Sequence, residues 1–206
     1  ALSAEQKVAV EAIRTALGRF EPFLLHGITG SGKTEVYLNA IDAVLERGGQ
    51  ALVLVPEIAL TPQTLRRFEE RFGAAAAYHS GLGERERGQV WASCRSGHAR
   101  VLIGTRSAIF VSFANLAIIV DDEEHDGSFK HQDGFRYSAR DLAIYRGRAE
   151  VLPVLLGSAT PSLESWSRAE QGRYRRLSLT RRVGGGGLPT VRLLDMNSVP
   201  RPASGV

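Results

Sequence analysis

Residues 27–34 of the chain have the composition of a phosphate-binding loop. They read Gly-Ile-Thr-Gly-Ser-Gly-Lys-Thr and match the pattern G-x-x-x-x-G-K-[ST]. Glycines let backbone N–H groups converge on phosphate oxygens, and the N-terminus of a following helix adds a favourable dipole. We therefore expect a nucleotide-binding loop formed by Gly27, Thr29, Gly30, Ser31, Gly32, Lys33 and Thr34.

Two side chains of this loop have distinct predicted roles. Lys33 is expected to contact the β- and γ-phosphates of ATP, and the Thr34 hydroxyl to ligate Mg²⁺. The alternative is a glycine-rich turn with a surface lysine. It is disfavoured because lysine is scarce: among the 26 basic residues, only Lys7, Lys33 and Lys130 are lysines.

A buried-strand pattern at 116–120 leads into a run of acidic residues and a histidine: Asp121, Asp122, Glu123, Glu124 and His125. A P-loop enzyme needs one carboxylate for Mg²⁺ and another that polarises the attacking water. We assign Asp122 to the metal and Glu123 to the water. Asp121 also follows the apolar run and could exchange roles with Asp122, and an acidic surface turn is the structural alternative. His125 is expected near the γ-phosphate or at the contact with a second lobe, because no other His or Cys lies at zinc-ligand spacing.

The next segment interleaves aromatic and basic side chains on a glycine-containing loop. Lys130, Phe135, Arg136 and Tyr137 suit base stacking combined with phosphate contact, which predicts a DNA-binding loop. The alternative is a loop whose aromatic rings pack at the edge of the core, with Phe129 the first to do so.

Two further loops follow predicted strands, where α/β sheets place their ligands. Residues 56–63 offer backbone N–H groups and Thr61 at a helix start, and 104–107 offer Thr105 and Arg106. Contacts of this kind position a DNA strand without reading its sequence. Arg106 could instead be a structural salt-bridge partner. The arginines at 66–67 and 173–176 are interpreted as solvated faces of a helix or strand.

Gln6 has two open interpretations. It lies three residues after Ser3, which predicts a capping box with a solvent-facing glutamine. It could equally contact the adenine of a bound nucleotide.

Short apolar runs alternate with amphipathic segments, which predicts an α/β fold with a mostly parallel central sheet flanked by helices. The helicase resemblance given below implies that this fold is a three-layer RecA-like P-loop NTPase. The predicted strands are 23–26, 51–55, 75–79, 101–103, 116–120 and 154–157. The predicted helices are 2–17, 33–47, 61–71, 84–96, 138–149 and 162–171.

Composition limits the class of protein. The chain has 206 residues, 43% hydrophobic, enough for one domain with a core. No apolar run reaches the ~20 residues of a membrane span, so we predict no membrane association. A net charge of +4 permits nucleic-acid binding. The lone cysteine, Cys94, excludes an internal disulfide and a cysteine-cluster zinc site, and is interpreted as a packed small residue rather than a catalytic thiol.

The chain ends also support expectations about domain organisation. We place a domain over 1–183, followed over 184–206 by a Gly-rich linker and the start of another region, with one more strand at 188–195. The N-terminus lacks both an initiator Met and a secretion signal, so we expect a trimmed or excised piece of an intracellular protein.

A further motif makes the prediction more specific. Residues 157–160, Gly-Ser-Ala-Thr, resemble the motif with which superfamily 2 helicases couple nucleotide state to strand movement, so Ser158 and Thr160 join His125 as coupling candidates. Together with 122–125 the motif resembles a DEEH-box helicase lobe. The segments 29–37, 55–63, 78–82, 103–110 and 157–165 resemble the primosomal replication-restart helicase family, and the similarity runs from Leu2 to about Asp195.

This resemblance implies a lobe of a 3′-to-5′ ATP-driven motor that acts on single-stranded and forked DNA in the bacterial cytoplasm, associated with the nucleoid. It implies as partners a second RecA-like lobe with an arginine finger, primosome proteins and single-strand-binding protein, and a zinc insertion outside this chain. Without the second lobe, the chain should be nearly inactive. The chain departs from the family pattern at His26 and Asp121, and Phe135 replaces a tryptophan. Two alternatives remain: a non-hydrolysing scaffold lobe, or another superfamily 2 translocase.

Overall fold

A computed structural model describes residues 2–73, 75–131 and 136–183 of the chain. Its main sheet has seven strands: β1 (Pro22–Gly27), β2 (Gln50–Leu54), β3 (Ala75–Tyr78), β4 (Val101–Gly104), β5 (Leu116–Asp122), β8 (Val154–Ser158) and β9 (Arg175–Leu179). The strand order is β3-β4-β2-β5-β8-β1-β9, and every pairing in this sheet is parallel. The predicted mostly parallel α/β sheet is therefore confirmed.

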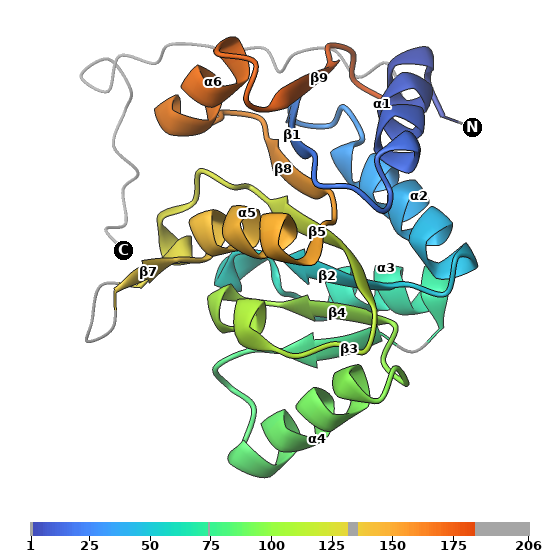
Figure 1. The fold of residues 1–206 in the computed structure, drawn as a ribbon, viewed down its shortest axis with the longest axis vertical. Coiled ribbons are helices and arrows are strands. Elements are labelled where there is room, and N and C mark those ends of the chain that lie inside the picture. Colours follow the sequence, from blue (N-terminus) through green and yellow to red (C-terminus); the bar gives the residue numbers. More distant parts are fainter. Residues whose placement is uncertain (1, 74, 132–135, 184–206) are drawn as a thin grey trace, which may run out of the picture.

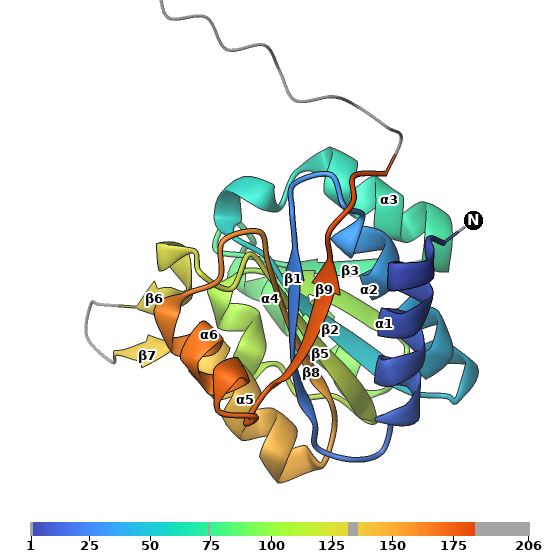
Figure 2. The same ribbon diagram turned by 90° about the horizontal axis from the view of Figure 1, so that it is seen from above.

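Helices cover both faces of this sheet: α1 (Ala4–Thr15), α2 (Lys33–Glu46), α3 (Pro62–Phe72), α4 (Glu84–Arg95), α5 (Ala139–Glu150) and α6 (Leu163–Glu170). Figures 1 and 2 show α1, α2 and α3 on one face and α4, α5 and α6 on the other. Each face has its own buried apolar cluster. The central strands β2, β4 and β8 are buried along their whole length, as expected for a parallel sheet covered on both sides.

Short elements complete the chain between these layers. Single 3-10 turns lie at Glu57–Ala59 (η1), Arg106–Phe110 (η2) and Gly127–Phe129 (η3). The short strands β6 (Lys130–His131) and β7 (Tyr137–Ser138) pair antiparallel. Among the described residues, no helix is long and apolar enough to cross a membrane.

The six predicted strands and six predicted helices are all present, with boundaries within two residues of those expected. The sequence does not predict β9, because its exposed arginines leave only Leu177 and Leu179 on the buried side of an edge strand. The predicted strand at 188–195 and the whole segment 184–206 lie outside the described residues.

Candidate nucleotide-binding site and adjoining loops

The sheet order brings three predicted motifs to one edge. Strand β8 lies between β1 and β5, with His26 opposite Ser158 and Asp122 opposite Gly157. Because parallel strands end at the same edge, the phosphate-binding loop after β1, the acidic residues after β5 and the segment 157–160 after β8 are neighbours. The fold thus brings together three segments that are far apart in the sequence.

The Gln6 side chain contacts the backbone of the predicted phosphate-binding loop at residues 31–32. Gly32 adopts φ +82°, and a Cβ there would lie 2.3 Å from Gln6 Nε2. That nitrogen donates to Ser31 O at 3.2 Å and to Gly32 O at 3.3 Å, while Oε1 accepts from Ser3 N at 2.8 Å. The bonds between Ser3 and Gln6 confirm the predicted capping box. The predicted solvent-facing position of Gln6 is wrong, because the residue is only 3% exposed. The contact with adenine stays a prediction.

Lys33 faces a pocket of about 300 Å³ at the end of the loop. This pocket is lined by residues 29–34 together with Arg67, Asp122 and Glu123. The Lys33 ammonium donates to Gly27 O at 3.1 Å and lies 3.6 Å from Glu123 Oε1. The first turn of α2 follows directly, so its N–H groups and dipole face the same space. The loop, the lysine and two carboxylates thus surround one cavity.

Asp122, and not Asp121, lines this pocket. The Tyr37 hydroxyl donates to Asp122 Oδ1 at 2.9 Å. Burial raises the pKa of Asp122, and the hydrogen bond from Tyr37 acts in the opposite direction. Burial and the nearby Asp122 raise the pKa of Tyr37 well above its usual value, so Tyr37 stays a protonated donor. A Cβ on Gly157 would lie 1.6 Å from the Tyr37 hydroxyl, so glycine is required there by close approach.

The residues present fit Mg²⁺ bound together with a nucleotide. Thr34 and Asp122 both line this pocket and a neighbouring cavity of about 710 Å³, which places a hydroxyl and a carboxylate oxygen around one region. Magnesium in nucleotide sites is held by one or two protein oxygens and completed by phosphates and water. No cluster of three or more His, Cys, Asp or Glu suited to a metal occurs among the described residues. Such a two-ligand site does not require one.

Glu123 occupies an unusual backbone conformation at the pocket. Its φ of +57° lies in the left-handed region, which costs a non-glycine residue conformational energy and is concentrated at functional sites. Its carboxylate lies 3.6 Å from Lys33 Nζ and 3.6 Å from His125 Nδ1. Glu123 is therefore between Lys33, the predicted phosphate-binding residue, and His125, the predicted coupling residue.

The three predicted coupling residues contact one another. His125 Nδ1 lies 2.7 Å from Ser158 Oγ, and His125 Nε2 lies 3.3 Å from Thr160 Oγ1. Ser158 Oγ also accepts from Thr160 N at 3.0 Å. Ser158 is buried, whereas His125 and Thr160 are exposed at the same edge as the pocket. The acidic segment and the segment after β8 are thus joined by side-chain hydrogen bonds.

Glu124 belongs to a buried network that the sequence did not predict. It accepts hydrogen bonds from Ser162 N at 2.7 Å, from Ser162 Oγ at 3.0 Å and from Ser165 Oγ at 2.8 Å. Arg140 NH1 donates to the same carboxylate at 3.2 Å, and both side chains are nearly inaccessible. The network fixes the start of α6 and the start of α5 to the acidic segment. Arg140 lies in the first turn of α5, three residues after Tyr137, and no local sequence pattern indicated its partner.

The loop candidates for DNA contact are partly at the surface. Thr61, the exposed N-cap of α3, accepts from Thr64 N at 3.1 Å. Arg106 NH1 donates to the carbonyls of Ser128 and Lys130, both at 3.1 Å, and forms no ion pair within the described part of the chain. Its structural role is therefore to hold a loop, not to form a salt bridge. Thr105 is only 3% exposed, which removes its hydroxyl from the surface.

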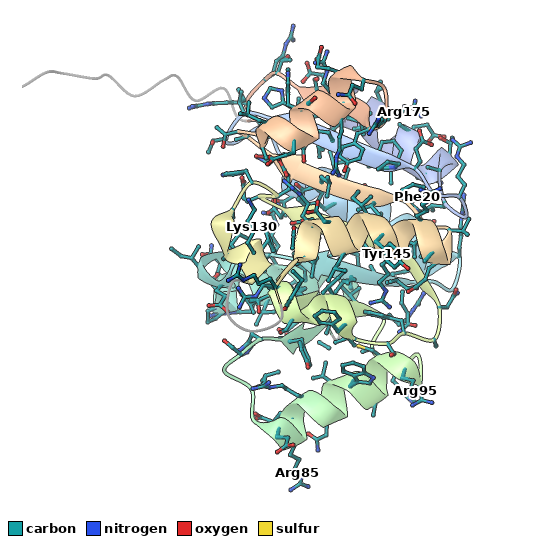
Figure 3. All side chains as sticks on the ribbon, turned by 60° about the vertical axis from the view of Figure 1, so that its left-hand side comes forward. Phe20, Arg85, Arg95, Lys130, Tyr145 and Arg175 are labelled. Carbon is teal, nitrogen blue, oxygen red and sulfur yellow. The ribbon has the colours of Figure 1, made fainter. Side chains whose placement is uncertain are left out.

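The aromatic loop is described only at its two ends. Phe129 is 2% exposed and belongs to the core, as the structural alternative expected. The Tyr137 ring meets the Phe110 ring edge-on, with centroids 5.0 Å apart. Lys130 and Arg136 are exposed, and Figure 3 shows Lys130 projecting from this end of the molecule beside α5. Phe135 lies outside the described residues.

Cys94 is buried, and burial raises the pKa of its thiol to about 11. It packs in the cluster under α4 to α6, so the interpretation as a packed residue is confirmed. An uncharged, inaccessible thiol is a poor nucleophile.

Comparison with known proteins matches this arrangement. The profile of the DEAD/DEAH box helicases matches residues 4–168. The chain belongs to the DEAD/DEAH box helicase family. Within it, the chain is 50% identical over 198 residues to replication restart protein PriA of Bacillus subtilis, covering 95% of this chain and 25% of that protein. It is 52% identical over 166 residues to PriA of Haemophilus influenzae, covering 80% of this chain and 23% of that protein. These similarities confirm the predicted resemblance.

Solved structures support the same fold. RecG, determined bound to a three-way DNA junction, has a TM-score of 0.63 at 26% identity, over 90% of this chain and 24% of that one. The helicase domain of Pyrococcus furiosus Hef has a TM-score of 0.59 at 20% identity, over 85% of this chain and 37% of that one. The RecA-like helicase fold is thereby confirmed. The chain spans about a quarter of the length of the PriA relatives.

Proposed function

We propose that residues 1–183 form the ATP-binding lobe of an ATP-dependent DNA helicase that acts in replication restart. The observation that supports this most is the single pocket lined by the phosphate-binding loop, Asp122 and Glu123. The similarity to PriA over nearly the whole chain supports the biological role. Residues 184–206 would form a linker to a following region.

Each pocket residue has a role in the proposed reaction. The backbone of 29–34 and the Lys33 ammonium bind the β- and γ-phosphates, and Thr34 and Asp122 hold Mg²⁺. When bound, the metal neutralises charge that develops on the phosphates. Glu123 orients the attacking water and accepts its proton. Its position 3.6 Å from Lys33 supports this role, because Lys33 is the residue proposed to bind the phosphates.

The lobe needs a partner for turnover. An arginine supplied from outside contributes about 10³–10⁵ in rate to phosphoryl transfer in related nucleotide hydrolases. We expect that residue from a second RecA-like lobe, so the isolated chain should bind ATP and hydrolyse it very slowly. The contacts of His125 with Ser158 and Thr160 provide a route from the hydrolysis site to the lobe edge.

DNA would bind across the loops at the carboxyl edge of the sheet. Thr61, Lys130 and Arg136 are exposed there and would contact phosphates, while Phe135 and Tyr137 would stack on bases. Arg106 would act by holding the backbone of Lys130, and Thr105 through its main chain. Further properties are proposed for the longer protein of which this lobe would be a part. They are 3′-to-5′ unwinding, action on forked DNA, location in the cytoplasm with the nucleoid, a zinc insertion, and primosome proteins and single-strand-binding protein as partners.

Calorimetric titration of Mg-ATP tests the nucleotide site. The wild-type chain should bind, and Lys33→Ala should weaken binding by more than about tenfold, because it removes a charge-assisted contact to phosphate. Lys7→Ala, on exposed helix surface, is the matched control and should bind as wild type. Absence of binding in the wild-type chain at millimolar Mg-ATP would contradict the proposal. A non-hydrolysing scaffold predicts binding without DNA-stimulated hydrolysis once the second lobe is present.

A further inference from the structure

An arginine from outside the recognised motifs lines the pocket of about 300 Å³ formed by residues 29–34, Arg67, Asp122 and Glu123, which we call the phosphate pocket after its proposed ligand. Arg67 lies on α3, which begins some thirty residues after the phosphate-binding loop. Its side chain is 55% exposed, so it is free to move. Among the described residues lining this pocket, Lys33 and Arg67 are the two cations. The sequence assigned Arg67 only to a solvated helix face.

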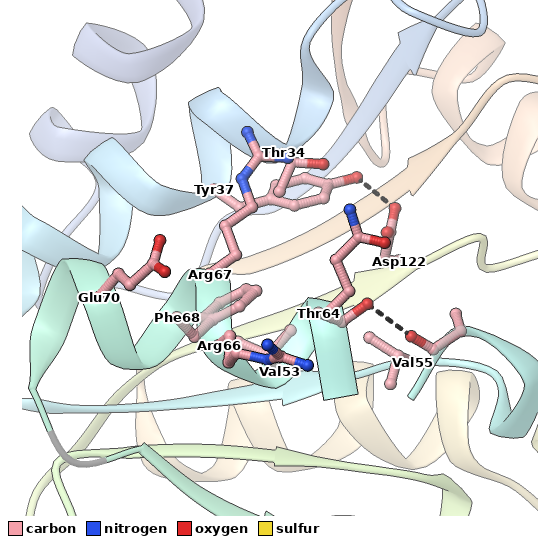
Figure 4. Close-up of a pocket in the computed structure, with 12 residues that line it drawn as sticks. Thr34, Tyr37, Val53, Val55, Thr64, Arg66, Arg67, Phe68, Glu70 and Asp122 are labelled. Carbon is pink, nitrogen blue, oxygen red and sulfur yellow. Dashed lines mark hydrogen bonds between the residues drawn. The ribbon is translucent and has the colours of Figure 1, made fainter. Parts of the chain in front are cut away.

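Arg67 lies where the phosphate pocket meets a larger neighbouring cavity. The phosphate pocket and the neighbouring 710 Å³ cavity share Thr34, Arg67 and Asp122. Thr34 and Asp122 are the residues that would hold Mg²⁺ beside the terminal phosphates of a bound nucleotide. Figure 4 shows Arg67 extending from α3 toward Thr34, with Asp122 at the far end of the Tyr37 ring. Arg67 thus lines the pocket beside Thr34, one of the two residues proposed to hold the metal at the phosphates.

The present partner of Arg67 is weakly bound. Arg67 NH2 lies 3.7 Å from Glu35 Oε2, and both side chains are more than a third exposed. Solvent-exposed pairs at this distance contribute little to stability. Asn39 Nδ2 donates to Glu35 Oε1 at 3.2 Å, so Glu35 keeps a partner if Arg67 leaves. Arginine presents a planar fork that matches the oxygens of a phosphate. A terminal phosphate carries up to about two negative charges, so it should compete well with the single charge of the half-exposed Glu35 carboxylate.

We propose that Arg67 exchanges Glu35 for the terminal phosphate of ATP and so distinguishes ATP from ADP. The inference rests on the proposed nucleotide site. Because α3 is capped by Thr61, in the loop proposed to contact DNA, this contact connects the terminal phosphate to the DNA side of the lobe. The link is the single helix α3, of eleven residues.

The test compares Mg-ATP and Mg-ADP binding by calorimetry in matched variants. Arg67→Ala should weaken Mg-ATP binding about tenfold and Mg-ADP binding less than about twofold, because one charge-assisted hydrogen bond is lost with ATP alone. Arg66→Ala is the control, since the neighbouring Arg66 lines the larger cavity but not the phosphate pocket. It should leave both affinities within about twofold.

Glu35→Gln separates a phosphate contact from a structural ion pair. If Arg67 acts on phosphate, Glu35→Gln should leave ATP affinity unchanged or increase it, because it frees the guanidinium and removes a negative charge. If the ion pair itself matters, Glu35→Gln and Arg67→Ala should weaken ATP binding alike, which would overturn the proposal. Equal losses for ATP and ADP in Arg67→Ala, or no loss, would also overturn it.

The same titrations distinguish this inference from the proposed function. Wild-type binding that disappears in Lys33→Ala but is unchanged in Arg67→Ala rejects the Arg67 contact alone. Absence of wild-type binding rejects both. Arg67→Lys should recover only part of the ATP preference, because lysine keeps the charge but lacks the fork.

Discussion

The four consecutive acidic residues 121–124 divide into two pairs with different environments. Asp122 and Glu123 line the phosphate pocket. Asp121 and Glu124 are 0% and 2% exposed and lie away from it. Glu124 accepts four hydrogen bonds, whereas both carboxylate oxygens of Asp121 have no hydrogen-bond partner among the described residues. The buried pair is itself divided, because Glu124 is the acceptor in a hydrogen-bond network and Asp121 is buried without a hydrogen-bond partner among the described residues.

The difference arises from register. Successive side chains of a strand point to opposite faces, so Asp121 and Asp122 cannot both face the pocket. The turn at Glu123, with its positive φ, then directs Glu124 back toward α5 and α6. A shift of one residue would exchange every role. The comparison can therefore be tested by changing one member of each pair.

The largest expected effect is on the buried network. Glu124→Ala should lower the free energy of unfolding by about 3–5 kcal/mol. It removes the only fully buried carboxylate partner of Arg140 among the described residues, which leaves the exposed Asp141 and Glu164. It also leaves the donors of Ser162 and Ser165 without their acceptor. Urea denaturation measures this loss. Glu123→Ala is the matched control and should change stability by less than about 1 kcal/mol, since its side chain is 36% exposed. Equal losses in the two variants would show that the acidic segment is not divided as described.

An intermediate effect is expected where β8 meets α2. Gly157→Ala should destabilise by about 1–3 kcal/mol, because its new methyl group would overlap the Tyr37 hydroxyl. Tyr37→Phe alone should cost about 1–2 kcal/mol through loss of the bond to Asp122. A double-mutant cycle measures the coupling: the combined variant should lose less than the sum. Strict additivity would contradict the close contact between Gly157 and Tyr37.

The smallest expected effect is an increase in the free energy of unfolding when the buried Asp121 is replaced. Burial, followed by the charges of Glu124 and Asp122, raises the pKa of Asp121 well above its usual value. Above the unfolded value of about 3.9, the unfolded chain ionises while the folded group resists, so this residue reduces stability as pH rises. Asp121→Val should therefore stabilise by about 1–2 kcal/mol at pH 7.5 and by less at pH 4. Denaturation curves of wild type and Asp121→Val at the two pH values measure this stabilisation. A stabilisation that is larger at pH 4 than at pH 7.5 would contradict the predicted pH dependence.

Much of the fold follows from local patterns. Apolar runs ending in Gly27, Asp122 and Gly157 identify the strands, and capping residues such as Ser3 and Thr61 identify helix starts. The order of strands depends on packing between distant segments, and no local pattern shows that β8 lies between β1 and β5. Edge strand β9 was not predicted, because it has only two buried apolar side chains and its other residues are exposed and polar.

The site was predictable where a motif fixes both residue type and spacing. Lys33, Thr34 and Asp122 belong to such motifs, and the structure places them around one pocket. Gln6 was identified in a capping box, but the direction of its amide depends on the fold of residues 31–32. Arg67 and Arg140 were missed because their partners are far away in the sequence and belong to no fixed spacing.

The most direct test of the central claim compares two neighbouring aspartates. Mg-ATP is titrated calorimetrically into Asp122→Asn and Asp121→Asn, with wild type beside them. We predict that Asp122→Asn weakens magnesium-dependent binding by about tenfold or more, since it removes a charged metal ligand, while Asp121→Asn binds as wild type. The reverse result, loss of binding in Asp121→Asn and retention in Asp122→Asn, would contradict the assignment of the pocket to Asp122 and Glu123.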